Sequence, residues 1–273
     1  LQQDKNAVEQ FQLEDWVSKR LKHDNLMQCY PHNTEKKYLF QCYEYLQGET
    51  LAQWLHRQEK PLNLDEILPI LQQTALALNA MHRLEMLHQD IRPKNIMVIN
   101  AENAMKIKLI DYGSTAVRGL VEINPKNANR ALGTLAFMAP EYFIDHSPSV
   151  HSDQFSLAVM AYYLFTKQLP YGTDLARCNS LKQMKKVQYH SIRKYRPDLP
   201  IWLDKILGQA LSIEPIHRFE ALSELIHNLM HPSKELLNSK PPAIIERDPL
   251  RFWQMSCAVL GLLFLLSIAW PFI

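Results

Sequence analysis

Glycine is scarce in this chain. The 273 residues include seven glycines, and Gly48 is the only one before Gly113. No G-x-G-x-x-G string occurs anywhere in the sequence. Because loops that wrap closely around a nucleotide phosphate need glycines at the points of closest approach, this sequence contains no glycine-rich phosphate loop.

Cysteines are few, and the net charge is small. The four cysteines are Cys29, Cys42, Cys178 and Cys257; they form no C-x-x-C pair, which argues against a disulfide framework or a zinc site. Lys and Arg exceed Asp and Glu by two, counting His as neutral. So balanced a charge gives no reason to expect a nucleic-acid partner. The hydrophobic fraction of 47% is that of an ordinary globular protein.

The hydrophobic pattern predicts an α+β protein, with a small strand-containing part followed by a mainly helical one. Helical spacing of apolar residues occurs over 8–21, 65–87, 153–165, 200–211 and 219–229. The aromatic stretch 38–45 predicts a strand, and 96–99 with 105–110 predict a hairpin around a polar turn. Asp65 is the expected cap of the long second helix, because Pro69 then lies near the first turn.

The predicted hairpin is flanked by the residues that carry the chemistry. Asp90 and Asn95 stand just before it, and Asp111 stands just after it. One hairpin would bring these three side chains together. Two carboxylates and an amide oxygen suit Mg²⁺ bound to nucleotide phosphates, and an Asp free of metal can accept a proton from an alcohol.

Five strings in this region resemble the motifs of the protein kinases. H-Q-D-I-R-P-K-N at 88–95 resembles the catalytic loop H-R-D-L-x-x-x-N, and D-Y-G at 111–113 resembles D-F-G. G-T-L-A-F-M-A-P-E at 133–141 resembles the segment that ends in A-P-E. S-D-Q-F-S-L at 152–157 resembles the start of the buried central helix of the large lobe, and P-I-H-R-F at 215–219 resembles the late motif whose Arg pairs with the A-P-E Glu. The chain is similar to this family over roughly residues 8 to 230.

The resemblance implies a protein serine/threonine kinase that uses ATP and Mg²⁺ and acts on Ser or Thr of protein substrates. Asp90 would accept or orient the hydroxyl proton, while Asn95 and Asp111 would hold the metal. Arg92 stands where these kinases usually carry a Lys near the γ-phosphate. Thr134 matches the threonine that contacts the catalytic Asp.

Two further residues take their roles from the same resemblance. Glu14 would be the Glu of helix C, which pairs with the Lys that contacts ATP, and Glu44 would contact adenine through its backbone in the segment that joins the lobes. An exposed charge is an equally good interpretation of Glu44. Gln89 replaces the Arg that binds a phosphorylated activation loop, and Gln cannot pair with a phosphate as a cation does. Activity independent of loop phosphorylation is therefore expected.

The resemblance implies a two-lobe kinase fold with an incomplete N-lobe at 1–48 and a mainly helical C-lobe at 49–230. The glycine-rich loop and its partner Lys are missing from the sequence, which favours an N-terminally truncated chain that binds ATP poorly. The rival hypothesis is a membrane-tethered pseudokinase that acts as a binding module. A small-molecule kinase is disfavoured by the peptide-substrate pattern around Thr134.

The end of the chain predicts a membrane anchor. Residues 231–250 read as a linker, and no charged residue occurs from Phe252 to Ile273. A helix of about 20 apolar residues spans a bilayer core, so 251–273 is predicted to be a single-pass transmembrane helix. Basic residues before it favour a cytoplasmic kinase domain. The arrangement resembles bacterial proteins in which a PP2C-like phosphatase precedes a kinase domain with a C-terminal membrane helix.

Overall fold

The structure is a computed structural model that describes residues 5–31, 39–101, 104–118, 135–144, 148–238 and 249–269. The chain divides into two compact units, Leu1–Ser233 and Lys234–Ile273. The end of the large lobe at residue 230 stays a prediction. The boundary between the two lobes at residue 48 stays a prediction.

The first unit begins with a helix and two short strands. Helix α1 (Lys5–Ser18) confirms the first predicted helix, with Val17 buried, and it ends before Leu21. Strand β1 (Cys29–Tyr30) pairs antiparallel with β2 (Cys42–Tyr43). Of the strand predicted over 38–45, only the two residues of β2 are strand among those described.

A three-stranded sheet contains the predicted hairpin. Strand β5 (Ile96–Ala101) pairs antiparallel with β6 (Ala104–Leu109), which confirms the hairpin, and β3 (Glu49–Thr50) pairs with the other edge of β5. The strand order is β3-β5-β6. Gly48 lies so close to the carbonyl of Val98 that a Cβ has no room there. This glycine is therefore required for the approach of β3 to β5.

Two helices follow this sheet edge. Helix α2 (Leu51–Arg57) was not predicted, and α3 (Leu64–His82) is the long second helix, shorter than expected at its C-terminal end. The predicted cap was wrong by two residues. Asn63 caps α3 by accepting the N–H of Glu66, whose side chain accepts the N–H of Asn63 in return, and Pro69 lies beyond the first turn. This reciprocal pair satisfies two otherwise free N–H groups.

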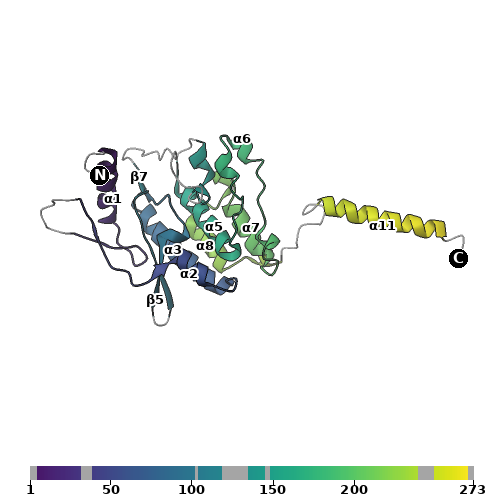
Figure 1. The fold of residues 1–273 in the computed structure, drawn as a ribbon, viewed down its shortest axis with the longest axis horizontal. Helices are drawn as coiled ribbons and strands as arrows, with labels where there is room; N and C mark the ends of the chain where they lie inside the picture. Colours follow the sequence, from purple (N-terminus) through teal and green to yellow (C-terminus); the bar gives the residue numbers. More distant parts are fainter. Residues whose placement is uncertain are drawn as a thin grey trace. The chain divides into compact units, whose positions relative to one another are not determined.

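The body of the unit is helical and is built around α5 (Val150–Thr166). Helix α5 begins at the cap Ser149, and nearly all of its side chains are buried. It contacts α3, α7 (Ile201–Ala210) and α8 (Leu222–Met230), and Figure 1 shows these helices grouped together. The three helices predicted in this region are confirmed, and α5 begins three residues earlier than its apolar pattern indicated.

Short elements connect these helices. Strand β4 (Met86–Leu87) pairs antiparallel with β7 (Ala116–Val117). Helix α6 is a single turn over Leu181–Met184. The 3₁₀ turns are η1 (Pro93–Asn95), η2 (Pro140–Phe143), η3 (Leu175–Arg177), η4 (Ile192–Lys194) and η5 (Pro215–His217).

The second unit contains α9 (Lys234–Leu237) and α11 (Pro249–Ala269). Among the residues that the structure describes, no helix has both the length and the apolar character needed to cross a membrane. The segment predicted to do so, 251–273, is covered in part. Residues 270–273 and the side chains of 262–269 lie outside the described part of the chain.

Candidate active site

The loop that carries Asp90 is fastened to the central helix by a buried carboxylate. Asp153 of α5 has no exposed surface, and it accepts the backbone N–H groups of His88 and Gln89 at 3.0 and 2.9 Å. His82 contacts the same carboxylate at 2.9 Å. Burial alone would raise the pKa of Asp153, but these partners hold it below the usual value. The ionised carboxylate therefore fixes the loop on α5.

Asp90 and Asn95 are held together within this loop. The Asn95 amide Nδ2 donates to both the carboxylate Oδ2 and the backbone oxygen of Asp90, each at 2.8 Å. Nε of Arg92 lies 3.4 Å from the same Oδ2. The Asp90 side chain is 10% exposed, so it is accessible but not free to rotate. Because Asn95 uses its nitrogen for Asp90, its amide oxygen is the atom suited to a metal.

The hairpin places the residue before Asp111 against the backbone of Asn95. Ile96 faces Leu109 in the register of β5 and β6, and the next pair is joined by a 2.9 Å bond from the Ile110 N–H to the Asn95 carbonyl. Asp111 follows directly, with a left-handed backbone at φ 68° and an exposed side chain. Non-glycine residues with such angles occur often at functional sites.

His88 lies at the centre of the three carboxylates. Its ring is buried, and Nδ1 accepts the N–H of Asp90 at 3.3 Å. Burial lowers the pKa of His88, although the charges of Asp153, Asp90 and Asp111 act to raise it. The buried His88 is thus a packing and hydrogen-bonding residue of the loop.

Glu14 of α1 reaches the other side of the site. A Cβ on Gly113 would lie 3.3 Å from both the Glu14 and the Asp111 carboxylates, so the two carboxylates flank this glycine. Gln10 of α1 also donates to the Gly113 carbonyl at 3.0 Å. Burial raises the pKa of Glu14, the hydroxyl of Tyr43 lowers it, and the charge of Asp111 raises it.

The Tyr43 hydroxyl is a hydrogen-bond partner of Glu14, the residue that the resemblance pairs with a Lys. This hydroxyl lies 3.2 Å from Oε1 of Glu14 and 2.6 Å from Oε1 of Gln41. Burial raises the pKa of Tyr43, so the hydroxyl keeps its proton. One proton can serve one of these oxygens at a time.

Glu44 is occupied by contacts within the protein. Its N–H donates to the Gln28 carbonyl at 2.9 Å, and its carboxylate accepts the Gln28 N–H at 2.7 Å. The same carboxylate pairs with the buried ammonium of Lys108, which also donates to the Leu26 carbonyl at 3.3 Å. The side chain is thus not a free exposed charge. A contact with adenine through the Glu44 carbonyl stays a prediction.

Comparison with known proteins identifies the family. The protein kinase domain profile matches residues 1–232. The chain belongs to the protein kinase family. The serine/threonine-protein kinase PrkC of Bacillus subtilis is 25% identical over 222 residues, which cover 81% of this chain and 33% of PrkC. The kinase pkn3 of Myxococcus xanthus is 30% identical over 221 residues, which cover 79% of this chain and 40% of pkn3.

The fold agrees with this assignment. The crystal structure of the PknI kinase domain of Mycobacterium tuberculosis superposes with a TM-score of 0.63 at 24% identity, and the match covers 84% of this chain and 80% of that domain. The chain therefore has the protein kinase fold. It spans about a third of the length of PrkC. The phosphatase of the bacterial two-domain proteins stays a prediction.

The kinase residues present fit a magnesium ion bound together with a nucleotide. Mg²⁺ is usually held by one or two carboxylates plus substrate phosphates and waters, not by a cage of protein ligands. Asp111 offers an exposed carboxylate, and Asn95 offers the amide oxygen that its bonds to Asp90 leave unused. No cluster of three or more His, Cys, Asp or Glu able to hold a metal occurs among the described residues.

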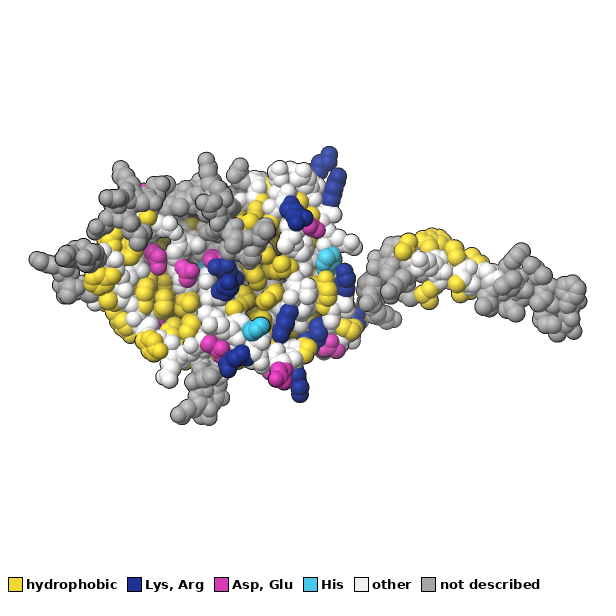
Figure 2. Space-filling view, in the orientation of Figure 1, with side chains coloured by type: hydrophobic (Ala, Val, Ile, Leu, Met, Phe, Trp, Pro, Cys, Tyr) yellow, Lys and Arg dark blue, Asp and Glu magenta, His cyan; other side chains and the backbone are white. Residues whose placement is uncertain are grey.

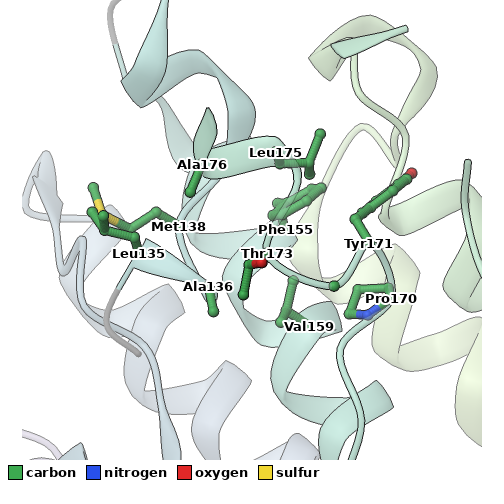
Figure 3. A pocket seen from close by; sticks show the side chains of 11 residues that line it. Leu135, Ala136, Met138, Phe155, Val159, Pro170, Tyr171, Thr173, Leu175 and Ala176 are labelled. Atoms are coloured by element: carbon green, nitrogen blue, oxygen red, sulfur yellow. The ribbon is translucent and has the colours of Figure 1, made fainter. Parts of the chain in front are cut away.

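The segment before the A-P-E Glu borders a small apolar pocket. Figure 3 shows Leu135, Ala136 and Met138 on one side of it, and Phe155 and Val159 of α5 on the other. Its volume of about 10 Å³ is the space of a single water, so we regard it as a packing defect. Thr134, the third predicted catalytic residue, lies outside the described residues.

Sequence reasoning assigned no role to Tyr43, Lys108 or Asp153. Asp153 belongs to the S-D-Q-F-S-L string at 152–157. Its position near the start of an apolar helix is a signal that could have identified it as a buried carboxylate that holds another segment in place. Lys108 alternates with apolar residues in its strand, a pattern that predicts a solvent-facing side chain. No local signal identifies it as buried, because its partner Glu44 lies 64 residues away.

Proposed function

We propose that this chain is the catalytic part of a protein serine/threonine kinase, which transfers the γ-phosphoryl group of ATP to Ser or Thr of proteins. The observation that carries the proposal is the joining of Asp90, Asn95 and Asp111 by one hairpin and one hydrogen-bonded loop. The curated relatives named above, PrkC and pkn3, are serine/threonine-protein kinases.

Each residue then has a role in the transfer. The acceptor hydroxyl oxygen forms a bond to the γ-phosphorus while the bond from that phosphorus to the bridging oxygen of ADP breaks. Asp90 takes the hydroxyl proton, and its position is fixed by Asn95. Arg92 places a guanidinium beside Asp90, where it can stabilise charge on the transferred group. Asn95 and Asp111 would hold Mg²⁺, which neutralises phosphate charge when bound.

Substitution of the two carboxylates tests the proposal. Transfer of labelled phosphate from MgATP to a Ser- and Thr-containing protein should fall by about a hundredfold or more in Asp90→Asn, because a general base contributes about 10²–10⁴ to the rate. Asp111→Asn should lower both transfer and the stabilisation of the protein by MgATP. Glu235→Gln, in the separate second unit, is the control. Equal transfer rates in all four proteins would refute these roles.

A second candidate is a pseudokinase that acts as a binding module. The observation that favours it is that Glu14 is hydrogen-bonded to the Tyr43 hydroxyl and forms no ion pair with a Lys or Arg among the described residues, whereas an active kinase pairs this Glu with a Lys. Thermal unfolding with and without MgATP distinguishes the two functions. Stabilisation by MgATP without any transfer, unchanged in Asp90→Asn, would favour the binding module. Transfer that depends on Asp90 would exclude it.

We also propose that activity does not require a phosphorylated loop. Gln89 stands at the position of the phosphate-binding Arg, and its side chain is 4% exposed and uncharged. Ser114→Ala and Thr115→Ala should therefore leave the transfer rate within about twofold, since there is no Arg at this position to bind the phosphate. A loss of activity in either variant would count against the idea.

We propose a membrane anchor at 251–273, with the kinase part on the cytoplasmic side. The uncharged run from Phe252 to Ile273 and the preceding Lys240, Arg247 and Arg251 support it. Cell fractionation of the full chain and of a variant that ends at Pro249 tests it. The full chain should sediment with membranes and resist alkaline extraction, and the shortened one should not. Equal distribution of both would refute the anchor.

A further inference from the structure

An open pocket lies between α2 and the loop that carries Asp90. It has a volume of about 880 Å³ and is lined by residues of β3 and α2 together with Lys94. Lys94 is part of the turn η1, and η1 packs against both α2 and β3. Lys94 directly precedes Asn95, whose amide touches Asp90. The pocket is thus lined by one residue of the loop that carries Asp90.

The charge at the lining is positive. Glu49, Arg57 and Lys94 are its charged residues, with His56 beside them. Glu49 is already neutralised by an ion pair with Arg57. Lys94 is exposed and takes part in none of the ion pairs among the described residues. The charges of Glu49 and Arg57 cancel, so among these three residues Lys94 carries the remaining positive charge.

The other polar groups of the lining satisfy one another. The Thr50 N–H donates to the Gln53 side chain at 3.0 Å, and the Thr50 hydroxyl accepts the Gln53 N–H at 3.2 Å. This capping box leaves Lys94 as the group that attracts a ligand. On the face drawn in Figure 2, Lys and Arg side chains are spread apart and do not merge into one patch.

The backbone of Lys94 is held in place while its side chain is not covered. Pro93 and Asn95 on either side are buried, and the Asn95 N–H closes the turn on the Arg92 carbonyl at 3.0 Å. Lys94 also occupies a variable position of the kinase catalytic loop, H-R-D-L-x-x-x-N. A fixed backbone with an exposed charge at a variable position is suited to substrate selection.

We propose that this pocket binds an acidic side chain of the protein substrate, with Lys94 as its ion-pair partner. Lys94 follows Asp90 by four residues in the same loop. Since an extended peptide advances about 3.3 Å per residue, we place the Asp or Glu about two to four residues from the acceptor Ser or Thr. The inference rests on the proposed kinase function and names the class of substrate that this site prefers.

Matched peptides test the inference. Three fluorescent peptides of equal length carry one Ser, flanked on both sides at two to four residues by Glu, Gln or Lys. Fluorescence anisotropy gives their affinities for the chain, and labelled ATP gives kcat/KM. The Glu peptide should bind about two- to fivefold more tightly than the Gln peptide, the range of a solvent-exposed ion pair. The difference should shrink at 0.5 M salt.

Lys94→Gln should bring the Glu-to-Gln affinity ratio to about one, and Lys94→Glu should favour the Lys peptide. Lys205→Gln, an exposed lysine of α7, is the control and should keep the ratio. A ratio unchanged in Lys94→Gln would overturn the inference. So would loss of the Lys94-dependent binding when MgATP is added, because the pocket would then hold nucleotide phosphates.

The two proposals fail in different ways. Phosphate transfer to all three peptides at equal rates, with equal affinities, would overturn the acidic preference and leave the kinase function standing. Lys94-dependent binding of the Glu peptide without transfer to any peptide would support the pocket and overturn the kinase function. Thermal melting of Lys94→Gln and Lys94→Glu shows whether each is folded, and Lys94→Gln alone decides the matter if the charge reversal unfolds the chain.

Discussion

Loss of the ion pair between Arg218 and Glu141 should lower the free energy of unfolding more than loss of any other single contact described above. Arg218 donates two bonds of 2.9 Å to the two Glu141 oxygens, and both side chains are buried. The guanidinium also donates to the carbonyls of Ser212, His151 and Ile213 at 2.9, 2.8 and 3.1 Å. The pair thus joins the A-P-E segment, the start of α5 and the loop after α7, which confirms the predicted structural role.

Arg218→Met removes these bonds and leaves Glu141 in the interior with the Ser152 hydroxyl at 2.7 Å. Truncating one partner of a buried pair costs about 3–5 kcal/mol, a large part of the usual 5–15 kcal/mol of a domain. Burial acts to raise the pKa of Glu141, and Arg218 holds it below its usual value. In the variant, which lacks Arg218, burial should raise the pKa of Glu141 above its usual value. The loss should therefore be largest near pH 7 and shrink as acid neutralises the carboxyl.

Urea unfolding followed by tryptophan fluorescence measures this change in the free energy of unfolding. Arg177→Gln is the control, because its ion pair with Asp174 is exposed and 3.9 Å long, and it should leave the unfolding midpoint unchanged. The double variant Arg218→Met/Glu141→Met should be more stable than Arg218→Met alone, since no unpaired charge is left behind. A loss below about 1 kcal/mol, or a double variant no more stable than the single one, would refute the reasoning.

Three further predictions concern the site. The pKa of Glu14 is raised, so stability should fall as pH rises through and above the usual carboxyl range, and Glu14→Gln should flatten that slope in urea titrations. The pKa of Asp153 is lowered, so its stabilisation should be present above about pH 4 and lost below it; Asp153→Asn should cost about 2 kcal/mol or more at pH 7. Gly113→Ala crowds Asp111 at 3.3 Å and should weaken stabilisation by MgATP in thermal melts, whereas Gly208→Ala should not.

The catalytic half of the site could be predicted because its parts are close in sequence. A hairpin fixes which residues stand at its two open ends, so the alternation of 96–110 is sufficient to place Asn95 beside Ile110. The same holds for the helices at 153–165, 200–211 and 219–229, whose apolar spacing reflects a buried face. Local periodicity and short-range pairing were sufficient for this half.

The nucleotide side of the site could not be predicted in the same way. The partners of Glu14 and Glu44 come from distant segments: Tyr43 lies 29 residues from Glu14, and Lys108 lies 64 residues from Glu44. Neither pair has a spacing that a helix or a hairpin imposes. The cap of α3 was misplaced for a different reason, since Asn63 and Asp65 are both good capping residues and only the bond to Glu66 decides between them.

The loop of Asp90 and the surroundings of Glu14 also differ in the contacts that hold their side chains and backbone in place. Gln89 and Asp111 both have left-handed backbones, at φ 65° and φ 68°, a conformation that non-glycine residues adopt at a cost unless their surroundings impose it. The buried carboxylate of Asp153 imposes it on the loop of Asp90. On the other side, Glu14 is placed by a tyrosine hydroxyl and carries a raised pKa. The loop of Asp90 is therefore held by a buried carboxylate, whereas Glu14 is held by a tyrosine hydroxyl, and a positive charge beside Glu14 would stabilise its ionised form.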